Sequence, residues 1–149
     1  IPSEVVTISN NTTLTYQLDT AESPYGYEIT GIATYAGWND TGRDAQEFTV
    51  LYSLVDDPDL FLPLDNISYN PGDSLNPSDT AVLLTELSGG ILAERVAAIR
   101  FAFGTQENGH VGYREIDVFG TAVVPEPSTF ALAALGLLGL VWCDRRKRQ

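Results

Sequence analysis

Alternating polar and apolar positions recur along residues 12–123, in short segments that turn-forming residues separate. Residues 12–19 (TTLTYQLD) show this pattern most clearly, because Leu14, Tyr16 and Leu18 fall on one side of an extended chain. The other β-rich segments are 27–35, 48–55, a weaker one at 66–69, 80–87, 96–103 and 113–123. About seven short strands at this pitch predict an all-β fold, an antiparallel β-sandwich of the jelly-roll kind.

The turn-forming residues mark the ends of the predicted strands. They are Ser23-Pro24, residues 39–44, 56–59 and 70–73, Gly89-Gly90 and Asn108-Gly109. Residues 91–100 are less clear, because Ala, Leu, Glu and Arg all favour a helix. We expect one short helical turn at residues 92–95, which leads into the strand 96–103.

A different pattern begins at Val124. A Pro-Glu-Pro triplet is followed by fourteen apolar residues, from Phe130 to Cys143, and these residues leave no polar face. As a helix they would extend about 21 Å, against a hydrocarbon core of roughly 30 Å. The pattern predicts a single short transmembrane helix. A buried helix in a globular core is the alternative, since apolar runs of this length often form one.

The residues on either side of the apolar stretch favour the membrane interpretation. Pro125 and Pro127 hold Glu126 and its neighbours extended, so the triplet stays an exposed peptide that an enzyme can bind. The same prolines would also suit an ordinary linker. On the other side lies a basic run, which should remain cytoplasmic. It consists of Arg145, Arg146, Lys147 and Arg148.

Triplet, apolar helix and basic run, in this order, closely resemble the PEP-CTERM sorting signal of Gram-negative bacteria. The resemblance implies that an exosortase-type enzyme recognises and processes the tail while the inner membrane holds it transiently. It divides the chain into an ectodomain, residues 1–123, and a sorting signal, residues 124–149. The ectodomain would then reach the cell surface or the extracellular matrix. Since export is expected and no signal peptide begins at Ile1, we expect a removed leader or a longer parent protein.

The net charge of the ectodomain limits the classes of partner that it can bind. Eighteen acidic and four basic residues precede Pro125, so their formal charge is −14. This charge argues against nucleic acid and anionic lipid surfaces and fits divalent cations or neutral, hydroxyl-rich ligands. Alternatively, the acidity only keeps an exported protein soluble. Cys143 is the one cysteine, which excludes an intramolecular disulfide and a cysteine-based zinc site.

Three stretches resemble strands of the galactose-binding-like (discoidin-type) jelly rolls. They are residues 26–53 (GYEITGIATYAGWNDTGRDAQEFTVLYS), 97–104 (AAIRFAFG) and 112–120 (GYREIDVFG), within a resemblance over roughly residues 12–122. In that family the acid of the final strand often helps to hold a structural calcium ion, which implies this role for Glu115. Alternatively, Glu115 and Asp117 are solvated strand residues, with a neighbouring arginine as a partner.

The polar loop at residues 38–44, between the predicted strands 27–35 and 48–55, is a candidate carbohydrate site. It combines an aromatic ring, on which a sugar can stack, with amide, carboxylate and guanidinium groups that bind hydroxyls. Asp56, Asp57, Asp59 and His110 would flank it if the loops gather at one end. Alternatively, the tryptophan fills the core beneath a turn, and Arg43 and Asp44 form a local salt bridge. The candidate ligand-binding residues are Trp38, Asn39, Asp40, Arg43 and Asp44.

These observations predict a non-catalytic exported protein that binds carbohydrate or exopolysaccharide. The sequence holds one histidine and neither a Gly-x-Ser-x-Gly nor a His-Glu-x-x-His motif, so we expect no enzyme. Carboxylate pairs such as Asp56-Asp57 keep a carbohydrate-active enzyme among the alternatives. The principal alternative is a purely structural surface module without a small ligand.

Overall fold

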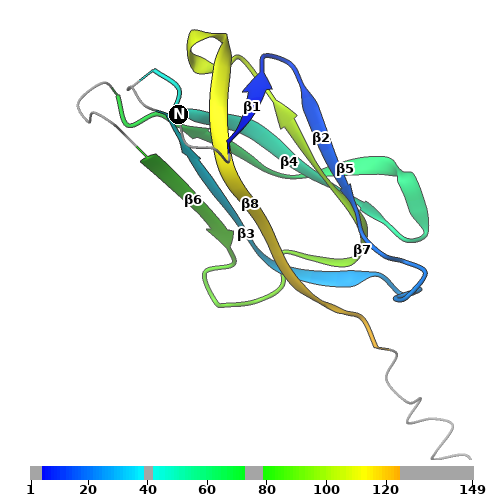
Figure 1. Cartoon of the computed structure of the whole chain (residues 1–149). Helices are drawn as coiled ribbons and strands as arrows, with labels where there is room; N and C mark the ends of the chain where they lie inside the picture. Colours follow the sequence, from blue (N-terminus) through cyan, green and yellow to red (C-terminus); the bar gives the residue numbers. More distant parts are fainter. Residues whose placement is uncertain (1–4, 39–41, 73–78, 125–149) are drawn as a thin grey trace, which may run out of the picture.

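The computed structural model describes residues 5–38, 42–72 and 79–124. Within these residues the chain forms strands and one short 3-10 helix (Figure 1). The elements are β1 (Val6–Ser9), β2 (Thr13–Gln17), β3 (Tyr27–Gly37), β4 (Gln46–Leu54), β5 (Asp57–Tyr69), β6 (Asp79–Thr85), β7 (Ala93–Phe103), η1 (Glu107–Gly109) and β8 (His110–Ala122).

The strands pair antiparallel in two groups that face each other. The first group runs β6-β3-β8-β1 and the second runs β2-β7-β4-β5. A short pairing of β3 with β7, through Tyr27 opposite Val96 and Ile29 opposite Ala93, joins them at one corner. The result is one continuous sheet that curls back on itself into a sandwich.

The hydrophobic core lies between the two groups. Strand β7 occupies the centre of its group, and Val96, Ile99 and Phe101 there have no exposed surface. Phe101 packs edge-on against Phe48 of β4, with their ring centroids 5.6 Å apart. Side chains of β3 and β8 close the core from the other side; they are Ile29, Ile32, Ala36, Val111 and Tyr113.

The all-β antiparallel architecture predicted from the alternation is confirmed. Each predicted strand has a counterpart, although the weak segment at 66–69 is the end of a long strand, β5. The helical turn expected at residues 92–95 is wrong. Leu92 lies in a bend and Ala93–Arg95 already belong to β7. Ala93 pairs with Ile29 of β3, and the backbone oxygen of Arg95 accepts a hydrogen bond from the Val55 N–H; this pairing outweighs the helix propensity of single residues. Strand β1 was not predicted.

Strand β5 shows why the break expected at residues 56–59 was misplaced. The turn occupies only Val55 and Asp56, and β5 begins at Asp57 with Pro58 as its second residue. On one side β5 pairs with β4, and its other side is a sheet edge. At an edge a proline is tolerated, because its missing N–H faces away from the ladder.

Gly26 has a conformation and a packing that no other residue type could match. It lies at φ +78°, and an added Cβ would lie 2.7 Å from the Arg95 carbonyl carbon and 2.8 Å from the Val96 oxygen. We predict that Gly26→Ala lowers the free energy of unfolding by about 3 kcal/mol or more. Gly89 has a similar φ of +71° with no neighbour within 4 Å, so Gly89→Ala should cost only about 1 kcal/mol. Urea unfolding of both variants checks this; equal losses would contradict the packing argument.

Tyr113 should make the stability of the domain depend on alkaline pH. Its side chain is 2% exposed, and its hydroxyl has no hydrogen-bond partner among the described residues. Burial raises the pKa of the phenol well above its ordinary value of 10.0. The unfolded chain releases this proton near pH 10, whereas the folded chain retains it, so the free energy of unfolding falls as the pH rises above about 10.

Tyr113→Phe keeps the ring and removes the titrating group. We predict a shallower decline in unfolding free energy above pH 10 and an unchanged or higher value at pH 7, because no hydrogen bond is lost. Urea titrations at pH 7, 9 and 11 measure both quantities. An identical alkaline slope in the two proteins would contradict the prediction.

Candidate functional site

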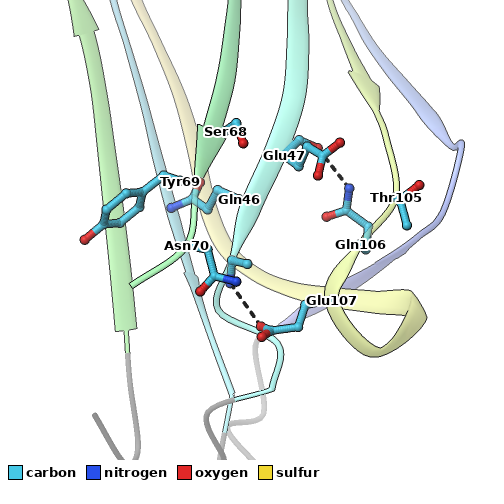
Figure 2. A pocket seen from close by; sticks show the side chains of 9 residues that line it. Gln46, Glu47, Ser68, Tyr69, Asn70, Thr105, Gln106 and Glu107 are labelled. Atoms are coloured by element: carbon cyan, nitrogen blue, oxygen red, sulfur yellow. Dashed lines mark hydrogen bonds between the residues drawn. The ribbon is translucent and has the colours of Figure 1, made fainter. Parts of the chain in front are cut away.

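A pocket of about 240 Å³ opens where β4 begins, β5 ends and the chain passes from β7 to β8. Figure 2 shows polar side chains from these three segments around it. We call it the Gln106 pocket. It is lined by Ala45, Gln46, Glu47, Ser68, Tyr69, Asn70, Thr105, Gln106 and Glu107.

Gln106 is the most constrained side chain of the pocket. It is 4% exposed, and its Nε2 donates hydrogen bonds to the backbone oxygens of Glu47 (2.9 Å) and Gly104 (3.3 Å). Those two acceptors fix the orientation of the amide. Its Oε1 is therefore turned toward the pocket (Figure 2), and it accepts no hydrogen bond from any residue that the structure describes.

The other groups around the pocket differ in how much they are already engaged. Glu107 Oε2 accepts a long hydrogen bond from the backbone N–H of Ala45 (3.5 Å), and Asn70 Oδ1 accepts one from Gly72 (2.7 Å). Tyr69 is 45% exposed, and its ring points away from Gln106 and Glu107 (Figure 2). The lining therefore combines carboxylate, amide and hydroxyl groups with an exposed aromatic residue.

A buried polar network fixes the first residues of β4 beside this pocket. The side chain of Gln46 has no exposed surface; its Oε1 accepts a hydrogen bond from Thr34 Oγ1 of β3 (2.5 Å), and its Nε2 donates to Thr80 Oγ1 of β6 (3.0 Å). Thr80 Oγ1 also donates to the backbone oxygen of Asp44 (2.5 Å). The network thus links the two halves of the sandwich and sets the position of Ala45 and Gln46 in the lining.

The predicted carbohydrate loop lies next to the pocket but is arranged differently from the expectation. Trp38 is half-buried, and the guanidinium of Arg43 lies over its ring, 5.0 Å from the centroid. An edge of the ring approaches Gly112, where an added Cβ would lie 2.7 Å from Trp38 Cε3. Asp44 is fully buried. Asn39 and Asp40 lie outside the described residues.

The residues expected to flank that loop divide between the two ends of the sandwich. Asp56, Asp57 and Asp59 follow the far end of β4, whereas the loop precedes its start. His110 begins β8 on the same side as the loop, where Asn108 Nδ2 donates to the backbone oxygen of Gly42 (3.0 Å). Gln106 carried no recognisable signal in the sequence, because nothing marks a loop glutamine as buried.

Glu115 lies exposed in β8, opposite Tyr35 of β3. A bulge in this pair leaves Arg114 without a partner residue in the ladder, and Arg114 Nη2 forms an ion pair with Asp79 Oδ1 (2.8 Å). Among the described residues, no three His, Cys, Asp or Glu side chains lie close enough to hold a metal ion together. The calcium role of Glu115 stays a prediction.

The tail agrees with a known sorting signal. Residues 123–147 match the family model of the PEP-CTERM protein-sorting motif, while a search of curated proteins finds no match to the chain. The resemblance of the tail is therefore confirmed: the chain carries the signal of an exported protein that is sorted by way of the membrane and processed by an exosortase.

The individual tail residues lie outside the described residues. This holds for Pro125, Glu126 and Pro127, for the predicted membrane segment from Phe130 to Cys143, and for the basic residues Arg145, Arg146, Lys147 and Arg148. In the part of the chain that the structure describes, no helix is long and apolar enough to cross a membrane.

Thr80 provides a test of the buried network. Thr80→Val keeps the volume and removes the hydroxyl, which leaves the Gln46 amide short of an acceptor in the core. We predict a loss of about 2 kcal/mol in the free energy of unfolding. Thr85→Val, at the exposed end of the same strand, should change it by less than about 0.5 kcal/mol. Similar values for the two variants in urea unfolding would show that the network contributes no stability.

Proposed function

We propose that this exported protein is a non-catalytic carbohydrate-binding module of the cell surface or extracellular matrix of a Gram-negative bacterium, and that the Gln106 pocket binds the sugar. One observation carries the proposal: the buried Oε1 of Gln106 faces the pocket without a hydrogen-bond donor from the described residues. A buried acceptor that lacks a donor costs free energy. A ligand hydroxyl would supply that donor.

The rest of the lining fits the same ligand class. A sugar presents hydroxyl groups at its edge and C–H groups on its faces. The edge suits Gln106, Asn70 and the carboxylates, and a face suits the exposed ring of Tyr69.

The finer fold assignment, a galactose-binding-like jelly roll, is itself part of the proposal and rests on the sequence resemblance. The Gln106 pocket lies at one end of the sandwich, where β4 begins and β5 ends. Fold alone does not establish a function, so the resemblance adds less than the pocket itself. The predicted loop residues Trp38 and Arg43 then act beside the pocket, as a neighbouring surface.

Binding to polysaccharides tests the proposal. The full chain, kept in mild detergent, is passed over immobilised neutral polysaccharides, including glucans and galactans. Tyr69→Ala should weaken binding at least about tenfold, since loss of an aromatic anchor costs 2 kcal/mol or more. Gln106→Met should weaken it by a similar factor, because the acceptor is lost.

Controls separate the pocket from other aromatic surfaces. Tyr25→Ala removes a tyrosine that is 50% exposed but lies before β3, away from the pocket, and should leave binding unchanged. Trp38→Ala tests the neighbouring loop in the same assay. If no polysaccharide binds the parent chain, the domain is a structural module. Binding that depends on Trp38 and not on Tyr69 would move the site to the loop.

A further inference from the structure

We propose that the Gln106 pocket selects sugars that carry a free amine, so that the preferred ligand is a cationic amino-sugar polymer. This inference rests on the proposed function and specifies its ligand class. It follows from the two carboxylates and the buried Gln106 oxygen of the pocket, and from the position of every arginine in the domain.

The charged groups of the pocket lining are hydrogen-bond acceptors, although the lining also holds donors in the hydroxyls of Ser68, Tyr69 and Thr105 and in the amide of Asn70. Both donors of the Gln106 amide are used by backbone oxygens, which leaves only its Oε1. The carboxylates of Glu47 and Glu107 accept hydrogen bonds and donate none. A protonated amine offers three N–H donors and a positive charge, and hydrogen bonds from a charged donor are about twice as strong as neutral ones.

No basic side chain of the pocket lining offsets these carboxylates. The four arginines of residues 1–124 are each engaged elsewhere. Arg95 pairs with Asp56 (2.6 Å) and Arg114 with Asp79 (2.8 Å). The guanidinium of Arg100 lies 3.5 Å from the centre of the Phe61 ring, and that of Arg43 covers Trp38. The pocket therefore lies in an uncompensated negative field, which attracts cations and repels acidic polymers.

Tyr69 adds a favourable contact that does not depend on hydrogen bonds. Tyr69 lines the pocket beside Asn70, and its exposed ring points away from Gln106 and Glu107 (Figure 2). An ammonium group over the face of a tyrosine ring is attracted by the negative charge of the π-system.

Three tetrasaccharides of equal length test the inference on the full chain by calorimetry: glucosamine tetramer, its N-acetylated form and cellotetraose. We expect the amine-bearing tetramer to bind about tenfold more tightly than the other two, as one charge-assisted hydrogen bond predicts. The preference should shrink as salt rises from 50 to 500 mM. Glu107→Gln and Glu47→Gln should each reduce it several-fold and leave the affinity for cellotetraose unchanged.

Asp57→Asn is the matched control, because it removes the same charge from an exposed residue at the far end of β4. It should leave the preference intact; an equal loss would show that only the overall charge matters and would overturn the assignment to the pocket.

Equal affinity for all three tetramers would overturn the inference and leave the proposed function standing. Binding to none of them, nor to any neutral polysaccharide, would overturn both. Binding that a chelator abolishes would replace the amine with a bound divalent cation.

Discussion

The hydrogen bonds of the buried Gln46 amide are the constraint on which the rest of the structure depends. An amide without exposed surface must find partners inside the protein, and here they come from β3 and β6, in the opposite half of the sandwich. The same Thr80 hydroxyl binds the backbone of Asp44. One network therefore sets the distance between the two halves, the start of β4 and the position of the loop that borders the pocket.

Periodicity in the sequence was sufficient for the architecture because alternation reflects burial on one face of a strand. It was insufficient where neighbours in space decide the outcome. Ala93–Arg95 join a strand because β7 is central and bonded on both sides, and Asp57–Asp59 join β5 because an edge accepts Pro58. Strand β1 is only four residues long, and it exists because β8 offers it a ladder from Val6 to Ser9. None of these neighbours can be read from a local segment.

For the candidate site, the sequence likewise indicated the types of residue but not their positions in space. The sequence indicated that aromatic and polar loop residues could bind a ligand, and the structure gathers such residues at one end of the sandwich. It could not indicate which aromatic ring stays accessible. Arg43 covers the ring of Trp38, whereas Tyr69 remains exposed. The sequence also could not reveal the role of Gln106. Its buried amide donates hydrogen bonds to two backbone oxygens, and one of them belongs to Glu47, which is distant in the sequence.

The division of charge along the chain connects the sorting signal with the proposed ligand. Half of the basic residues lie in the basic run of the tail, whereas the preceding residues carry a formal charge of −14. Once an exosortase has processed the tail, an acidic domain has no electrostatic attraction to an anionic membrane surface. Under the proposed function, its retention outside the cell then depends on what it binds. A cationic polymer would hold the domain through both the local pocket and the overall negative charge.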